Sequence, residues 1–92
     1  MIASDLTELI GDTPLLRLAR FAPDVQLFAK LELLNPYSLK DRAVLSMVTA
    51  AEARGELRPS MTLVEATSGN TGMAIAAIGC VRGYPVRLYM SE

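Results

Sequence analysis

Apolar residues follow two different spacings along this chain of 92 residues, and each spacing predicts one type of secondary structure. Short apolar or alternating runs predict four strands, at 15–18, 25–33, 61–66 and 86–90. Apolar positions three and four residues apart predict a helix over 39–54, with a stripe formed by Val44, Met47, Val48 and Ala51. A second apolar helix is expected over 71–82, and a glycine follows each helix, as is common at helix ends.

The order of these elements predicts an α/β fold with an open, mostly parallel sheet. Strands alternate with helices from residue 25 onward, which is typical of parallel βαβ units. Such crossovers are nearly always right-handed, so two in succession put both helices on one face of the sheet. The other face would be bare, whereas parallel sheets normally have both faces covered. We therefore expect an incomplete fold, in which residues 1–92 form the N-terminal part of a larger α/β domain or need a partner.

Small residues line one side of the second expected helix and would let it lie close against a sheet. These residues are Gly72, Ala76, Gly79 and Gly83. Cys80 in the same helix is interpreted as a core residue rather than a nucleophile. At the start of the first helix, Ser38 is the expected N-cap residue, and Asp41 is its capping-box partner three residues later. Arg42 is interpreted as a surface or ion-pairing residue.

The composition excludes several classes of function. A net charge of −1 provides no basic field, so we expect neither a nucleic-acid partner nor binding to an anionic membrane. There is no histidine and one cysteine, which rules out a His/Cys metal site and an intramolecular disulfide. The chain begins without the pattern of a signal peptide and has no apolar run of about 18 residues. These features favour a cytoplasmic protein.

Lys40 lies where a polar loop turns into the first expected helix. The positive end of the helix dipole makes a cation unfavourable in the first turn. A lysine amine that loses its proton is a nucleophile and can form a Schiff base with a carbonyl compound. A solvated surface lysine is the more common outcome at such a position, so Lys40 alone does not identify a function.

A second polar turn, residues 67–72, lies between an expected strand and the second expected helix. Ligands bind at the carboxyl ends of strands in open α/β sheets, and the free N–H groups of a helix start attract anions. Thr67, Ser68 and Thr71 add hydroxyl groups, Asn70 adds an amide, and Gly69 permits close approach of a ligand. An ordinary capped helix start is the alternative. The spacing matches neither a P-loop nor a dinucleotide-binding fingerprint.

The two polar segments are Asn35-Pro36-Tyr37-Ser38-Leu39-Lys40-Asp41-Arg42 and Thr67-Ser68-Gly69-Asn70-Thr71-Gly72. Together they resemble the fold-type II pyridoxal-phosphate enzymes, and most closely the cysteine synthase (O-acetylserine sulfhydrylase) and cystathionine β-synthase group. The start, Ile10-Gly11-Asp12-Thr13-Pro14-Leu15-Leu16-Arg17-Leu18, also resembles the beginning of these enzymes, as do Lys30-Leu31-Glu32 and Val64-Glu65-Ala66. The resemblance spans nearly the whole chain.

The resemblance implies a site and a reaction. Lys40 would be the catalytic residue, forming the internal aldimine with pyridoxal phosphate and later removing the α-proton of the substrate. Asn70 would bind the cofactor's ring hydroxyl oxygen. The carboxylate of an amino-acid substrate would be held by Thr67, Ser68, Gly69 and Thr71. The reaction would be a β-replacement through an aminoacrylate, in which a sulfur nucleophile replaces the leaving group of O-acetylserine or a similar activated serine.

The resemblance also implies features that this chain does not contain or leaves open. Enzymes of this kind bind the cofactor phosphate through a later Gly/Thr-rich loop, and they form homodimers at full length. Many have one more residue where Tyr37 alone stands between Pro36 and Ser38. Related reactions on the same scaffold remain alternatives: cystathionine formation, diaminopropionate synthesis and β-elimination. A truncated, inactive chain that acts only as a binding module is a further alternative.

Overall fold

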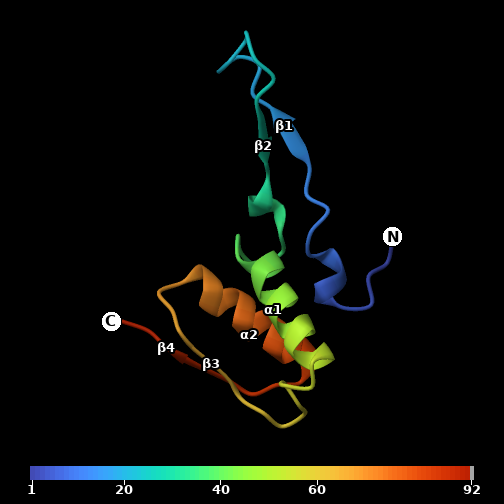
Figure 1. Cartoon of the computed structure of the whole chain (residues 1–92), viewed down its shortest axis with the longest axis vertical. Coiled ribbons are helices and arrows are strands. Elements are labelled where there is room, and N and C mark those ends of the chain that lie inside the picture. Colours follow the sequence, from blue (N-terminus) through green and yellow to red (C-terminus); the bar gives the residue numbers. More distant parts are fainter. Residues whose placement is uncertain (92) are drawn as a thin grey trace.

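The computed structural model describes residues 1–91 and contains two helices, two 3-10 turns and four short strands (Figure 1). In chain order they are η1 (Leu6–Leu9), β1 (Leu15–Arg17), β2 (Phe28–Lys30), η2 (Glu32–Leu34), α1 (Asp41–Ala53), β3 (Leu63–Ala66), α2 (Asn70–Arg82) and β4 (Val86–Tyr89). The α/β class is confirmed. No helix among the described residues is long and apolar enough to cross a membrane.

The strands form two separate pairs rather than one parallel sheet. β1 pairs with β2 in antiparallel fashion, and β3 pairs with β4 in parallel around α2. The predicted βαβ unit from residue 61 onward is therefore confirmed, whereas the unit predicted to begin with the strand at 25–33 is wrong. Residues 18–27 are too few for a crossover between parallel strands, so they close an antiparallel hairpin. After β2 the chain turns into η2 instead of continuing as a strand.

The hydrophobic core lies between the two helices and the strands beside them. Val44 and Val48 of α1 pack with α2, as the apolar stripe predicts, whereas Met47 of that stripe is exposed. The buried core consists of Val44, Val48, Ala74, Ile75, Ile78 and Tyr84. The β1–β2 hairpin projects away from this core (Figure 1). The radius of gyration is accordingly 16.1 Å, well above the ~12 Å expected for a compact domain of this length.

Helix α2 lies directly on the β3–β4 pair, and its glycines make this possible. A Cβ atom at Gly72 would lie 2.5 Å from Thr67 Cγ2, and one at Gly79 would collide with Val86 Cγ2. The prediction of a smooth, closely packed side is confirmed at both positions. Helix α2 ends at Gly83, which adopts a left-handed conformation with φ of 78°. Cys80 is exposed to solvent, so its predicted place in the core is wrong.

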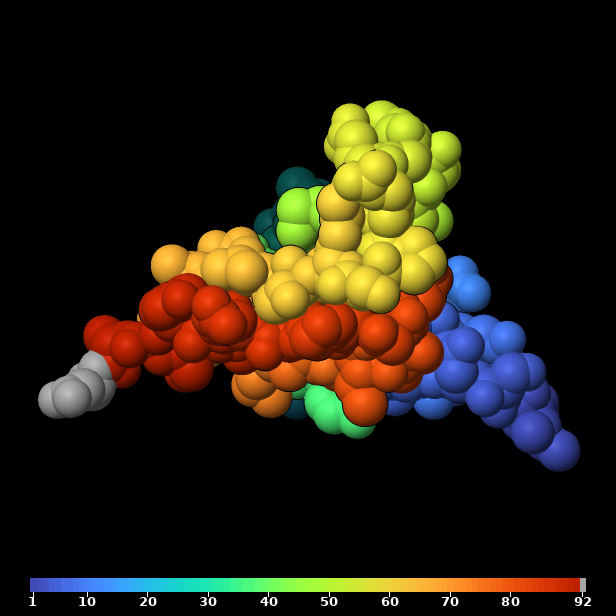
Figure 2. Space-filling view, turned by 90° about the horizontal axis from the view of Figure 1, so that it is seen from below, coloured from blue at the N-terminus to red at the C-terminus, as the bar shows by residue number. Residues whose placement is uncertain are grey.

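The opposite face of the β3–β4 pair is uncovered within the described residues. Side chains alternate along both strands, so that Leu63 and Leu88 are partly buried while Val64 and Tyr89 are exposed. Figure 2 shows the segments that carry β3 and β4 lying side by side across one side of the molecule. The expectation of one covered and one bare face is confirmed for this strand pair. Parallel pairs are normally covered on both faces, which marks this surface as unusual.

Candidate functional site

Lys40 immediately precedes the first residue of α1 and is exposed to solvent. Its backbone is helical, with φ of −97° and ψ of −2°, and its N–H donates to Ser38 Oγ at 3.1 Å. Within residues 1–91, the Lys40 ammonium group forms neither a hydrogen bond nor an ion pair. The amine is therefore accessible at the start of the helix, where the sequence predicts it.

The buried carboxylate of Asp41 shapes the loop that carries Lys40. Asp41 is 1% exposed, and its side chain accepts the N–H groups of Tyr37 at 2.7 Å and Ser38 at 3.1 Å. The predicted return bond from Asp41 to Ser38 is confirmed. The helix begins at Asp41 rather than 39, so Lys40 and not Ser38 occupies the N-cap position. Ser38 instead accepts the N–H of Lys40 through its side-chain oxygen.

The starts of the two helices are joined by one hydrogen bond. The Ser38 hydroxyl donates to the main-chain carbonyl oxygen of Asn70 at 2.8 Å, across a separation of 32 residues. Asn70 is the first residue of α2, and its own side chain is exposed to solvent. The loop that carries Lys40 therefore lies against the turn that carries Asn70, as the pairing of the two segments implies.

Thr67 organises the turn before α2. Its Oγ1 atom accepts the N–H groups of Gly69 at 3.2 Å and Gly72 at 3.0 Å, and it retains its own proton for donation. The N–H groups of Ser68, Asn70 and Thr71 have no acceptor within residues 1–91. Since these free donors lie at the positive end of the α2 dipole, the turn is suited to bind an anion.

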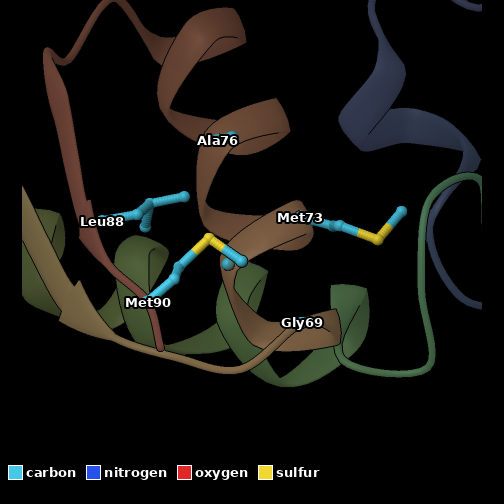
Figure 3. Close-up of a pocket in the computed structure, with 6 residues that line it drawn as sticks. Gly69, Met73, Ala76, Leu88 and Met90 are labelled. Carbon is cyan, nitrogen blue, oxygen red and sulfur yellow. The ribbon is translucent and has the colours of Figure 1, made fainter. Parts of the chain in front are cut away.

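The turn before α2 has open space beside it, and an apolar cavity begins at Gly69. A Cβ atom at Gly69 would meet no other atom within 4 Å. A cavity of about 310 Å³ begins there and is lined by apolar groups of Gly69, Gly72, Met73, Ala76, Leu88 and Met90. Figure 3 shows Leu88 and Met90 reaching from the β4 segment toward α2, which carries Met73 and Ala76. Neither Lys40 nor Asn70 lines this cavity, so its chemistry suits apolar groups rather than an anion.

A polar cluster next to Lys40 was not identified from the sequence. Arg42 donates to Glu32 from Nε and Nη2, and the buried Thr13 hydroxyl donates to the same carboxylate. The hydrogen bonds from Arg42, followed by that from Thr13, lower the pKa of Glu32 to about 2. The same partnership with Glu32 raises the pKa of Arg42. The ion-pairing interpretation of Arg42 is confirmed.

Asn35 extends this cluster to the N-terminal segment. Its Oδ1 accepts the Gly11 N–H at 2.8 Å, and its Nδ2 donates to the Glu32 carbonyl oxygen at 2.8 Å. A Cβ at Gly11, which has φ of +92°, would lie 3.1 Å from the Arg42 guanidinium. The only signal of these contacts in the sequence is that Thr13, Glu32 and Asn35 fall within the segments that carry the family resemblance.

This arrangement of lysine, free amides and α/β scaffold agrees with a comparison against known families. The model of the family described as pyridoxal-phosphate dependent enzyme matches residues 6–92. The chain belongs to this family. Members of the pyridoxal-phosphate dependent enzyme family use that cofactor, so the cofactor and the enzyme family predicted from the resemblance are confirmed.

Curated relatives in this family include cysteine synthases. Cysteine synthase B of Escherichia coli (strain K12) is 50% identical over 92 residues, which cover 97% of this chain and 30% of the relative. The probable cysteine synthase of Bacillus subtilis (strain 168) is 45% identical, over 99% of this chain and 30% of the relative. The chain thus spans about 30% of the length of the curated relatives that it matches.

Solved structures of similar fold belong to related enzymes. O-ureido-L-serine synthase is 43% identical with a TM-score of 0.85, and the match covers 98% of this chain and 29% of that chain. The O-acetylserine dependent cystathionine beta-synthase of Helicobacter pylori is 30% identical with a TM-score of 0.87, over 100% of this chain and 32% of that chain. These structures agree with the predicted resemblance to the fold-type II pyridoxal-phosphate enzymes.

Proposed function

We propose that these 92 residues form the N-terminal part of a cysteine synthase-like enzyme. The enzyme would replace the leaving group on the β-carbon of an activated serine, such as O-acetylserine, by a sulfur nucleophile. Relatives named cysteine synthase at 45–50% identity support this reaction. The observation that carries the proposal is the hydrogen bond from Ser38 to the Asn70 carbonyl oxygen, because it joins the lysine loop to the turn with free amides.

Two side chains fit pyridoxal phosphate. When bound, this cofactor supplies an aldehyde that condenses with amines and a ring that withdraws electrons from the substrate's α-carbon. Lys40 offers an accessible primary amine for that aldehyde, and it would act as the base at the substrate's α-carbon. The exposed Asn70 amide can donate to the ring hydroxyl oxygen. The phosphate group is assigned to no residue of this chain, since the Gly/Thr-rich loop that the resemblance implies is not among its segments.

The turn before α2 would hold the substrate's carboxylate. The free N–H groups of Ser68 and Thr71 and the hydroxyl groups of Thr67, Ser68 and Thr71 provide donors for its two oxygens. The Gly69 N–H already donates to Thr67 Oγ1, so Gly69 would contribute open space rather than a donor. The helix dipole adds a favourable interaction with the negative charge.

The two lysines of this chain, Lys30 and Lys40, allow a direct test. Mixed with pyridoxal phosphate, the protein should develop a visible absorption band as the Lys40 amine condenses with the aldehyde and releases one water. Borohydride reduction followed by peptide mapping should then locate the cofactor on Lys40. The Lys40→Ala variant should lose the band, whereas the control Lys30→Arg should keep it. A label found on Lys30 or on the N-terminal amine, with an unchanged band in Lys40→Ala, would contradict the proposal.

An assay of the products distinguishes the proposed reaction from its alternatives. With O-acetylserine and sulfide, the expected products are cysteine and acetate in equal amounts. Cystathionine formed from homocysteine would instead favour a cystathionine β-synthase activity, which the similarity to the Helicobacter pylori structure supports as the second candidate. Pyruvate and ammonia without either product would indicate β-elimination. These assays should be performed with the longest form of the protein, because the chain spans about 30% of its relatives' length.

We also propose an oligomeric state, a location and an absent partner for the full-length protein. We infer a homodimer for the full-length form, a cytoplasmic location, and no nucleic-acid partner. The net charge of −1 supports the last of these. Light scattering coupled to size exclusion would measure the oligomeric state, and a monomer at micromolar concentration would contradict the first.

A further inference from the structure

Ser38 connects the two segments to which the proposed function assigns the chemistry. It is 9% exposed, and its hydroxyl makes two bonds in different directions. It accepts the Lys40 N–H at 3.1 Å and donates to the Asn70 carbonyl oxygen at 2.8 Å. We propose that Ser38 is a positioning residue, which holds the Lys40 loop and the Asn70 turn in one fixed arrangement. This inference rests on the proposed roles of Lys40 and Asn70.

The direction of the Ser38 hydroxyl proton follows from its surroundings. A hydroxyl has one proton, and two acceptors lie within reach: the Asn70 carbonyl oxygen at 2.8 Å and Asp41 Oδ1 at 3.2 Å. The Asp41 carboxylate already accepts the N–H groups of Tyr37 and Ser38. The contact with the Asn70 oxygen is the shorter of the two, so we assign the proton to it, and the Ser38 hydroxyl then links the two helix starts.

Packing of the helices alone does not replace this link. The apolar contacts between α1 and α2 involve Val44, Val48, Ile75 and Ile78, which lie at least three residues inside the helices. Lys40 and Asn70 lie at the helix starts, where the chain is held by polar contacts. Misplacement of a reacting group by about 1 Å can cost on the order of 100-fold in rate, so a bond at the ends controls reactivity more than it controls folding.

The first arm of the test measures hydrogen exchange in the protein without cofactor. Three of the amides with a defined acceptor near the junction serve as probes: Lys40 on Ser38 Oγ, Gly72 on Thr67 Oγ1, and Met73 on the Gly69 carbonyl oxygen. In Ser38→Ala, exchange should become several-fold faster at Lys40 and also at Gly72 and Met73. Unchanged exchange at Gly72 and Met73 would overturn the inference, because a purely local role affects Lys40 alone.

Three matched variants make this arm decisive. Ser38→Thr keeps the hydroxyl and should restore slow exchange at all three amides. Ser46→Ala removes an exposed hydroxyl in the middle of α1 and should change none of them. Cysteine is close to serine in size but is a weak hydrogen-bond donor, so Ser38→Cys should behave like Ser38→Ala. It replaces the alanine variant in this comparison if Ser38→Ala does not fold.

The second arm follows the visible band formed with pyridoxal phosphate. Ser38→Ala should slow its appearance by roughly 10- to 100-fold, while Ser38→Thr and Ser46→Ala stay near wild type. A band that forms equally fast in Ser38→Ala would overturn the positioning role and leave the proposed function intact. Absence of the band from the wild type itself would count against the proposed function, and the exchange arm would still decide whether Ser38 couples the two segments.

Discussion

Arg42 holds the Glu32 carboxylate through two hydrogen bonds, from Nε to Oε1 at 2.5 Å and from Nη2 to Oε2 at 3.0 Å. The buried Thr13 hydroxyl donates to Oε2 at 2.6 Å. These donors stabilise the charged carboxylate and lower its pKa from 4.5 to about 2. The cluster connects the N-terminal segment to η2 and α1, and it lies two residues beyond Lys40.

The lowered pKa of Glu32 predicts a specific loss of stability in acid. The unfolded chain takes up this proton near pH 4.5 and the folded chain only near pH 2. The contribution of Glu32 is therefore fully present above pH 4.5 and is lost as the pH falls from 4.5 to 2. Urea midpoints measured over this window should fall more steeply for the wild type than for Glu32→Gln. Parallel curves would contradict the assignment, and added salt should reduce the difference, since Arg42 is partly exposed.

Removal of the buried Asp41 carboxylate should destabilise the fold. Its two bonds to loop amides are charge-assisted, and Asp41→Ala would leave those N–H groups without their acceptor. We expect a decrease of about 1.5–3 kcal/mol in the free energy of unfolding. Asp24→Ala, in an exposed turn, is the control and should change it little. Equal urea midpoints for the two variants would show that Asp41 does not organise the loop.

Gly79→Ala should destabilise the contact between α2 and β4. The added methyl group would collide with Cγ2 of Val86. The valine side chain is branched at Cβ, so it has little freedom to rotate away. Overpacking of this kind costs about 1–3 kcal/mol. The neighbouring change Cys80→Ala alters an exposed side chain and should leave the thermal midpoint nearly unchanged. A Gly79→Ala midpoint equal to that of Cys80→Ala would show that the helix can move away from the strand at little cost.

Asn70→Ala separates binding from folding. Ser38 bonds to the main-chain oxygen of residue 70, so the substitution leaves the link between the helix starts in place. The lost amide would remove about 0.5–1.5 kcal/mol of binding free energy, which weakens the affinity for pyridoxal phosphate by roughly 2- to 10-fold. Titration followed by absorbance measures this affinity. Unaltered affinity, with an unaltered urea midpoint, would remove Asn70 from the cofactor site.

Local signals along the chain predicted the helices well and the strand pairing only in part. Gly55 and Gly83 follow α1 and α2 because both adopt positive φ, which glycine tolerates best. The strand predicted at 25–33 is confirmed only over Phe28–Lys30, and its partner was predicted wrongly. Alternating residues indicate a strand without naming the strand beside it, since hydrogen bonding in a sheet is a property of two segments.

At the candidate site, too, local patterns identified individual residues but not their distant partners. Its motifs identified Lys40 and Asn70 as residues of interest, because an unusual lysine and a polar turn are visible in a single segment. The contacts of Ser38 with Asn70 and of Glu32 with Arg42 span 32 and 10 residues, and they had no local signature. The exposed position of Cys80 was also missed, because the apolar residues around it do not show how far the core extends around the helix.

The sequence by itself determined the class of fold, the positions of α1 and α2, and the family of the chain, because these depend on local spacing and on motifs. Only the tertiary structure decided that β2 pairs with β1, that Thr13 and Arg42 share Glu32, and that Ser38 bonds to Asn70. Such contacts arise when packing of the helices brings distant segments together, and each polar group then bonds to the partner that burial leaves within reach.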